Sequence, residues 1–312
     1  MATEATPGPV SAADLVRRSI QGRRTDIGGL LFQGALLMAL LLALAILVTL
    51  IADVLGSAMD VFSVRGADFL NSDMSSLPER AGVAQGINGS LMLMGFVIVL
   101  AFPLGIGAAI YMEEYAPDNR VTRFLTASIR NLAGVPSVVY GLLGLAIFVQ
   151  LLAGVTGGRS LMSGGLTMSV LVLPIVIITA SEAIRAVPMS IREAGFGVGA
   201  TRWEVVRSHV LPYAAPGILT GMILSLSRAL GEAAPLLLIG GAPVFFAAGD
   251  RGFAETLQGE YTALPAIIFT WSRKSLRDFG ESTAAAIVVL LVVLLLINAT
   301  AIFLRNRYER RW

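Results

Sequence analysis

Two ionisable residues, Arg228 and Glu232, stand inside an apolar stretch that runs from about Tyr213 to Gly240. A charge at membrane depth costs at least ~2.5–3.5 kcal/mol, and such residues commonly mark a substrate path. Their spacing of four places both on one helix face. An arginine fork offers bidentate, charge-assisted hydrogen bonds to a tetrahedral oxyanion, and the glutamate restrains that fork. We therefore predict that the pair lines a water-filled path; the alternative is a mutually neutralising pair that locks helix packing.

A second candidate group lies at the start of another apolar stretch, in NLAGVPSVVYG. Gly134 and Pro136 weaken a helix there, and Ser137 and Tyr140 supply hydroxyls. Freed backbone groups at membrane depth are tolerated where they line a cavity. Ser137 and Tyr140 are therefore further candidates for the path, with an ordinary kinked, close-packed helix as the alternative.

Composition identifies the elements that must position these residues. Hydrophobic residues make up 55% of the 312 residues and charged residues only 14%, against about 25% charged in soluble proteins. The chain has no cysteine and one histidine, His209, which excludes thiolate sites and multi-histidine metal centres. The net charge of +2 is too small and dispersed for nucleic-acid binding. The composition indicates an all-α integral membrane protein with no cofactor, metal or catalytic residue of its own.

Charge-free runs of about 20 residues predict the membrane spans. Five are clear, and the stretch containing Arg228 and Glu232 is interpreted as a sixth, fifth in chain order. The clear runs lie between the following charged residues: Asp26 and Asp53, Arg80 and Glu113, Arg130 and Arg159, Arg159 and Glu182, and Glu281 and Arg305. A rival count splits the Arg228 stretch into two spans, but its second half has two prolines and a Gly-Gly pair. Pro103 and Pro174 are interpreted as kinks.

With six spans both termini lie on one side. Fifteen basic residues then fall on that side and seven on the other, which marks the first side as cytoplasmic. Seven spans would place the basic tail RNRYERRW outside the cell, against the positive-inside rule. We expect a bacterial cytoplasmic (inner) membrane protein with cytoplasmic N- and C-termini.

The remaining segments complete the predicted organisation. Residues 1–28 form a cytoplasmic tail, 29–84 a first span, acting as a signal anchor, with a polar external loop, 85–305 a core of five spans, and 306–312 a basic cytoplasmic tail. The external segment 241–281 contains TALPAIIFTW, too short to span, and is predicted as an interfacial or re-entrant helix with Trp271 at the headgroup level.

The cytoplasmic segment 186–212 is too long for a passive helix connection. Ile191, Ala194 and Val198 fall near helical spacing, Gly199 breaks the helix, and a second amphipathic pattern begins at Trp203 and is expected to stop at Pro212. Two short helices around a glycine turn predict a docking element for a soluble partner; an interfacial hairpin is the alternative. His209 is interpreted as a surface imidazole.

No energy source is visible in the chain. The only lysine, Lys274, lacks the Walker A context G-x-x-x-x-G-K-[ST]. Three possibilities follow: ATP is hydrolysed by a partner, an ion gradient drives transport, or the protein is a channel.

The segment from Glu193 to Pro212 resembles the EAA signature of ABC importer permeases. The residues that match in register are Glu193, Ala194, Gly199, Leu211 and Pro212, while Gly195 replaces the third alanine and His209 stands where isoleucine is usual. RNLAGVPSVVYGLLGL, SRALGEAAPLLLIGGA, TALPAIIFTW and NATAIFLRNRYERRW are similar to the phosphate-specific permease subunits of the PstA type, and the resemblance covers roughly residues 85–312.

The resemblance implies the six-span fold of type I ABC importer permeases and import of inorganic phosphate. It implies a heterodimer with a PstC-type permease, two ATPase subunits docked on the coupling residues Glu193, Ala194, Gly199, Leu211 and Pro212, and an extracytoplasmic phosphate-binding protein. ATP hydrolysis belongs to the partner, and membrane lipid surrounds the spans. A permease for another oxyanion and a stand-alone ion-coupled carrier or channel using Arg228 and Glu232 remain alternatives.

Overall fold

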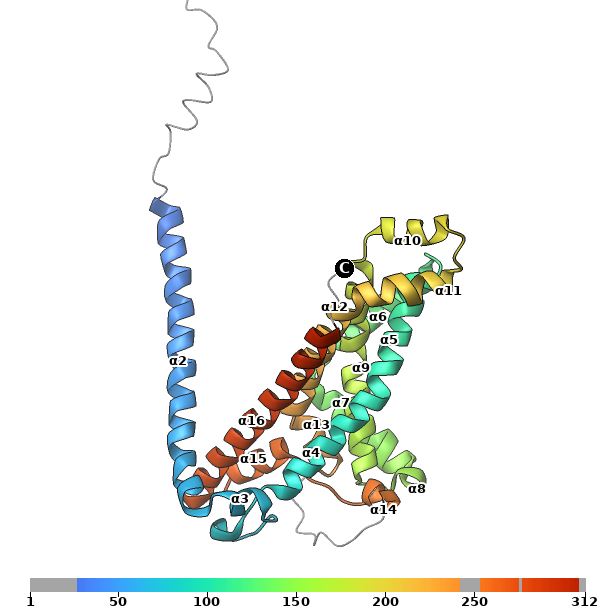
Figure 1. Ribbon diagram of the computed structural model, residues 1–312. Coiled ribbons are helices and arrows are strands. Elements are labelled where there is room, and N and C mark those ends of the chain that lie inside the picture. Colours follow the sequence, from blue (N-terminus) through green and yellow to red (C-terminus); the bar gives the residue numbers. More distant parts are fainter. Residues whose placement is uncertain (1–26, 242–252, 275–276, 309–312) are drawn as a thin grey trace, which may run out of the picture. The chain divides into compact units, whose positions relative to one another are not determined.

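The computed structural model describes residues 27–241, 253–274 and 277–308, and every regular element within these ranges is a helix (Figure 1). The predicted tail 1–28 lies almost wholly outside the described residues, as does most of the tail 306–312. The chain divides into two compact units, Met1–Asp53 and Val54–Trp312, and helix α2 (Ile27–Arg65) runs through their boundary. The α2 side chains up to Asp53 are exposed throughout.

Among the described residues, five helices are long and apolar enough to cross a membrane, and there are six spans if the bent pair Arg120–Ala133 and Ser137–Leu151 is counted as one. The five are α2, the continuous helix Ala84–Tyr115, α9 (Leu161–Arg185), the continuous helix Arg202–Gly231, and α16 (Arg277–Tyr308). The predicted six-span, all-α fold is confirmed.

The third predicted span is shorter than the charge-free run suggested. It begins at Ser137, continues through α7 (Ser137–Gly144) and the π-helical turn η4 (Leu145–Leu151), and is followed by the short α8 (Ala153–Thr156). A separate helix, α6 (Arg120–Ala133), precedes it, and the axis turns by 99° between them. Gly134 and Pro136, the predicted helix weakeners, lie at this turn.

Three of the described spans pass through prolines without ending: α9 through Pro174, and two others directly after a π-helical turn. The helix Ala84–Tyr115 consists of α4 (Ala84–Phe96), η2 (Val97–Ala101), α5 (Phe102–Ile110) and η3 (Tyr111–Tyr115). Pro103 follows the π-helical turn η2, and Pro212 follows the π-helical turn η5 (Val206–Val210) in the same way. Proline lacks an N–H and crowds the carbonyl at i−4, and a π turn shifts the preceding bonds to i−5. The prediction that Pro212 ends its helix is therefore wrong, because the helix continues as α12 (Leu211–Gly231).

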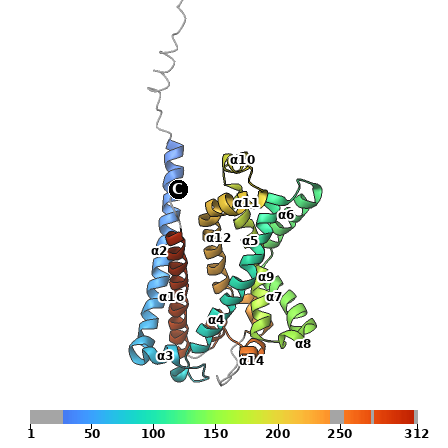
Figure 2. The same ribbon diagram turned by 45° about the vertical axis from the view of Figure 1, so that its right-hand side comes forward.

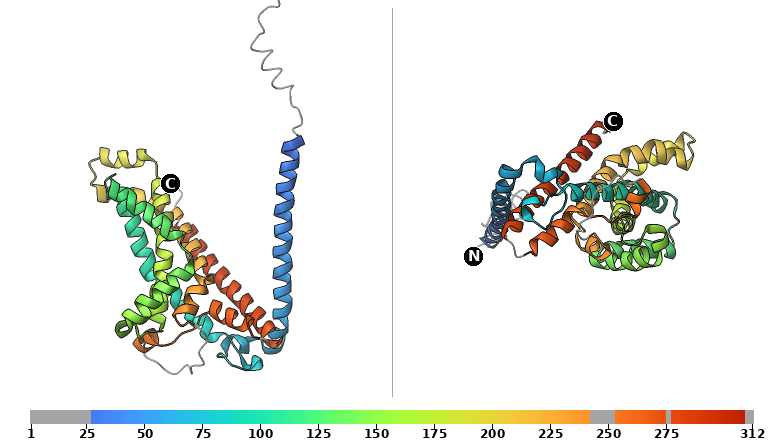
Figure 3. Two further views of the ribbon diagram at one scale, coloured as in Figure 1. Left: turned by 180° about the vertical axis from the view of Figure 1, so that it is seen from behind. Right: turned by 90° about the horizontal axis from the view of Figure 1, so that it is seen from below.

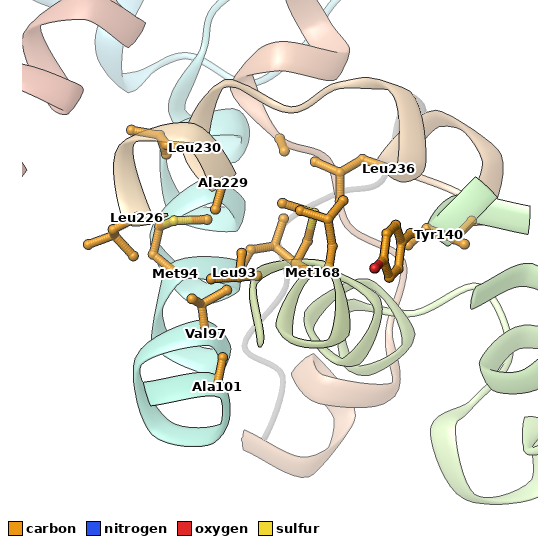
Figure 4. Packing of buried hydrophobic residues seen from close by; sticks show 14 of the residues in the cluster. Leu93, Met94, Val97, Ala101, Tyr140, Met168, Leu226, Ala229, Leu230 and Leu236 are labelled. Atoms are coloured by element: carbon orange, nitrogen blue, oxygen red, sulfur yellow. The ribbon is translucent and has the colours of Figure 1, made fainter. Parts of the chain in front are cut away.

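The main core forms where α4, η2, α9 and α12 meet. Leu93, Met94 and Val97 pack with Met168 of α9 and with Leu226, Ala229 and Leu230 of α12 (Figure 4). Gly165 of α9 lies so close to the Phe96 ring that a methyl group at Gly165 would overlap it. Small residues at helix contacts are the main source of close packing in membranes, where lipid is as apolar as the side chains.

A second cluster holds the segment after α2. Phe69 of α3 (Ala67–Asn71) packs near Trp271 of α15 (Leu264–Ser272), whose ring also lies 5.8 Å from that of Phe279. The short helix predicted around Trp271 is confirmed. Only 1% of Trp271 is exposed, because the rings of Phe69 and Phe279 pack against it; its position at the headgroup level stays a prediction.

The helices of the unit Val54–Trp312 have two distinct ends. α6, α10 (Met189–Gly197) and α11 (Arg202–Val205) lie at one end, and α8 and α14 (Phe253–Gln258) lie at the other (Figures 1 and 2). The view from behind shows the same separation (Figure 3). The backbone N–H of Leu161 donates to the Gly259 carbonyl at 3.0 Å, which joins two segments predicted to be external.

Candidate functional site

Arg228 lies in the last turn of α12, and the helix ends at Gly231. Glu232 has extended backbone angles, φ −80° and ψ 112°, and α13 (Ala234–Ile239) begins two residues later. The prediction that Arg228 and Glu232 share one helix face is therefore wrong. The reason is Pro235: in a continuous helix its ring would meet the carbonyl of Gly231 and its missing N–H would break the ladder.

The two side chains nevertheless form the predicted ion pair. Arg228 Nε lies 3.5 Å from Glu232 Oε1, with 56% of the arginine side chain and 20% of the glutamate side chain exposed. No other ion pair or hydrogen bond of the Arg228 guanidinium occurs within the described part of the chain. A partly exposed pair contributes about 0–1 kcal/mol, so an incoming oxyanion can displace the carboxylate at little cost.

The break after Arg228 is held against the third span. α13 packs on α7, where the Cβ of an alanine at Gly141 would lie 2.7 Å from Pro235 Cα. This contact brings the segment that follows Glu232 to the turn that carries Tyr140. Within the described residues, no hydrogen bond or ion pair joins Arg228 or Glu232 to Ser137 or Tyr140.

The two predicted hydroxyls have different environments. Tyr140 is buried, and its hydroxyl donates a 2.8 Å hydrogen bond to the Leu132 carbonyl across the 99° turn. This bond holds α6 and α7 at their angle, which is a structural task. Ser137 is partly exposed at the first position of α7 and remains the hydroxyl available to a ligand.

The segment 186–212 contains the predicted helix, glycine turn and second helix. α10 ends at Gly197, Gly199 has a φ of +82°, and α11 begins after a capping box between Thr201 and Glu204. Gly199 occupies the left-handed region that side chains disfavour. Glu193 and Ala194 are exposed on α10, Leu211 is partly exposed and Pro212 exposed, and His209 is on the surface as predicted.

The structure explains why glycine replaces the third alanine of the EAA signature at Gly195. It is buried, and a Cβ there would lie 2.8 Å from Val205 Cγ2. The glycine lets α10 and α11 approach closely. On the outer side of the hairpin, several large apolar side chains are exposed: Met189, Phe196, Val198 and Trp203. Apolar groups of this kind on a projecting hairpin are typical of a surface that binds another protein.

Sequence reasoning missed a buried ion pair behind the hairpin. Arg192 Nη2 lies 2.8 Å from Glu114 Oε1, and only 13% and 8% of the two side chains are exposed. The same guanidinium donates to the carbonyls of Ile184 and Val187, at the end of α9. Arg192 therefore fastens α10 to the ends of two spans. The only sequence signal was Glu113-Glu114 at the end of an apolar run, and Glu113 pairs with Arg185 at 2.7 Å.

The comparisons with known proteins fit this geometry. Residues 101–312 match the family described as "Binding-protein-dependent transport system inner membrane component". Over 174 residues the chain is 36% identical to the probable ABC transporter permease protein YqgI of Bacillus subtilis, covering 55% of this chain and 58% of that protein. The chain thus spans little more than half the length of this relative.

Two further relatives carry phosphate transport names. The phosphate transport system permease protein PstC of Haemophilus influenzae is 30% identical over 238 residues, covering 69% of this chain and 75% of that protein. The protein PstA 1 of Mycobacterium tuberculosis is 34% identical over 196 residues, covering 62% and 61%. The comparisons do not separate the PstA type from the PstC type.

Solved structures agree on the fold. A bacterial ABC transporter involved in the import of the polysaccharide alginate has a TM-score of 0.62 at 18% identity, covering 89% of this chain and 97% of that one. The MetNI methionine ABC transporter, in an inward-facing conformation, has a TM-score of 0.57 at 16% identity, covering 73% and 98%. The helices, the projecting hairpin and the family match together define a membrane permease of the type I ABC importer fold: this chain belongs to the family of binding-protein-dependent transport system inner membrane components.

Proposed function

We propose that this chain is the permease subunit of an ATP-driven phosphate importer and that it forms half of the translocation path. The observation that carries the proposal is the exposed guanidinium of Arg228, paired with Glu232 at 3.5 Å where the fifth span breaks. Arginine is suited to a tetrahedral oxyanion because its planar fork binds two oxygens at once. The PstA and PstC names of the relatives support phosphate as that oxyanion.

The partners follow from the same proposal. The exposed apolar side chains of the α10–α11 hairpin support docking of an ATPase subunit on the coupling residues Glu193, Ala194, Gly199, Leu211 and Pro212. A second, PstC-type permease completes the path, and a phosphate-binding protein delivers the anion at the end that carries α8 and α14. This arrangement places the α10 end in the cytoplasm of a bacterial cell, in its inner membrane, with residues 1–28 and 306–312 on that side.

The substrate assignment is tested with Arg228→Ala, with Arg80→Ala as the matched control. Arg80 is exposed, and within the described residues no hydrogen bond or ion pair joins it to a predicted path residue. We expect Arg228→Ala to abolish ATP-dependent uptake of radiolabelled phosphate while the complex still assembles, and Arg80→Ala to leave uptake unchanged. Normal phosphate uptake by Arg228→Ala would rule out Arg228 as the substrate site. Poor assembly of the complex with Glu232→Gln would show that the Arg228–Glu232 pair is structural.

Two alternatives are distinguished by the same preparation. If the chain is a permease for another oxyanion, we expect the complex to import radiolabelled sulfate or molybdate, and unlabelled phosphate not to compete for that uptake. A stand-alone carrier predicts ion-driven uptake by the chain alone in vesicles without ATP. Purification of the tagged chain in mild detergent is expected to bring down an ATP-binding subunit and a second permease; recovery of the chain by itself would favour the carrier.

A further inference from the structure

Helix α6 presents an unpartnered apolar face. Exposed fractions are 64% for Val121, 70% for Phe124, 47% for Leu125 and 46% for Leu132. Spacings of three, four and eleven place these side chains on one side of an α-helix. Nothing within the described residues covers them, although the rest of the helix contacts α9.

The opposite face of α6 is basic and faces an open cavity. Arg123 and Arg130, seven residues apart, line a cavity of about 610 Å³ together with Ala127 and Arg185. Arg120 lies next to this face and is also exposed. The helix therefore has an apolar side and a cationic, water-facing side, which is the pattern of helices that lie in a membrane interface.

The orientation of α6 fits that position. Its axis is turned by 99° from the span Ser137–Leu151, so α6 runs nearly perpendicular to that span. Helix α6 contacts α9, and its residues Ile129 and Arg130 line a small pocket together with residues of the last turns of α9.

We propose that α6 lies in the plane of the membrane at the α10 end, with its apolar face in the lipid and its arginines at anionic headgroups. Charge favours lipid over a protein as the occupant, because three arginines flank the apolar residues. Among the residues that the structure describes, the ion pair of these arginines is Arg123 with Asp118, at 3.7 Å. The Tyr140–Leu132 hydrogen bond at 2.8 Å then links this interfacial helix to the third span. The inference goes beyond phosphate transport and does not depend on the substrate.

The absence of cysteine from the sequence allows a clean test. The full chain, purified with the subunits that accompany it, carries a nitroxide at Phe124→Cys or at the matched control Ala127→Cys on the opposite face. Both positions are exposed, so neither label disturbs the core. The samples are reconstituted in phosphatidylcholine vesicles with or without phosphatidylglycerol, and electron paramagnetic resonance measures collisions with oxygen and with a water-soluble nickel chelate.

We expect the Phe124→Cys label to collide mainly with oxygen, as lipid-exposed labels do, and the Ala127→Cys label mainly with the nickel chelate. Removal of phosphatidylglycerol is expected to move the Phe124→Cys label toward water, and Arg120→Gln, Arg123→Gln and Arg130→Gln together to abolish this dependence. Nickel collisions equal at both positions would place α6 in water, and a label shielded from both reagents would place a protein on it. Either result, or a depth independent of phosphatidylglycerol, overturns the proposal.

Discussion

At the scale of single residues, a close backbone contact holds α13 against α7, and a buried ion pair fastens the α10–α11 hairpin to the spans. Gly141 is a glycine because Pro235 of α13 lies against it, and Glu114 is tolerated in an apolar region because Arg192 neutralises it. Both residues lie far in sequence from their partners. Their effects are therefore open to test by small substitutions with matched controls.

The substitution Gly141→Ala is expected to lower phosphate uptake, because the added methyl group would lie 2.7 Å from Pro235 Cα and push α13 from α7. Overpacking of this kind typically costs about 1–3 kcal/mol. Gly107→Ala in α5 is the control, since nothing lies within 4 Å of its added methyl group. Uptake measured in vesicles should fall only for Gly141→Ala; equal activity of the two variants would show that this contact does not shape the path.

The substitution Glu114→Ala is expected to destabilise the protein by about 3–5 kcal/mol, because it leaves the buried guanidinium of Arg192 without its counter-charge. The control is Glu113→Ala, whose partner Arg185 has 58% of its side chain exposed and can be hydrated. The readout is the midpoint of thermal unfolding in detergent. A similar midpoint for both variants would contradict the special role of the buried pair.

At the scale of elements, the α10–α11 hairpin is connected directly to the ends of several spans. Arg192 joins α10 to the ends of α9 and η3, and α11 continues without a break into the fifth span. Displacement of the hairpin must therefore move three spans. The left-handed turn at Gly199 sets the angle between the two arms of the hairpin.

The substitution Gly199→Val is expected to raise the ATP hydrolysed per phosphate imported. A left-handed backbone costs an ordinary residue about 1–2 kcal/mol, and the space around Gly199 is open, so strain alone acts. Gly199→Asn is the control, because asparagine tolerates this conformation. Assays of hydrolysis and uptake on one preparation give the ratio; an unchanged ratio in Gly199→Val would argue against the hairpin as the coupling element.

At the scale of the whole molecule, the distribution of charge predicts which end faces the cytoplasm. Within the described part of the unit Val54–Trp312, α6, α10 and α11 lie at one end, and α8 and α14 lie at the other (Figure 2). Under the six-span prediction, the sequence has its excess of basic residues on the side of the segment 186–212, which contains α10, and the positive-inside rule assigns that side to the cytoplasm.

Single cysteines test this orientation. Leu77→Cys, 57% exposed at one end, is expected to react with a membrane-impermeant maleimide on intact cells. Val198→Cys, 83% exposed at the hairpin, is expected to react only after lysis. The reverse labelling pattern would show the inverse orientation, with the hairpin outside the cell.

The sequence alone determined the number of spans, the glycine turn and the pairing of Arg228 with Glu232, and it predicts the sidedness of the connections. These features depend on local quantities: apolar length, charge, and the backbone freedom of glycine and proline. Only the tertiary structure decided that the fifth span breaks between the paired residues and that a π-helical turn lets the helix continue through Pro212. The tertiary structure also decided that Trp271 is buried and that the Tyr140 hydroxyl bonds across the turn between α6 and α7. It also decided that Arg192 meets Glu114, 78 residues away. Contacts between distant segments depend on how the helices pack, and no local pattern encodes which two charged residues will face each other in the folded chain.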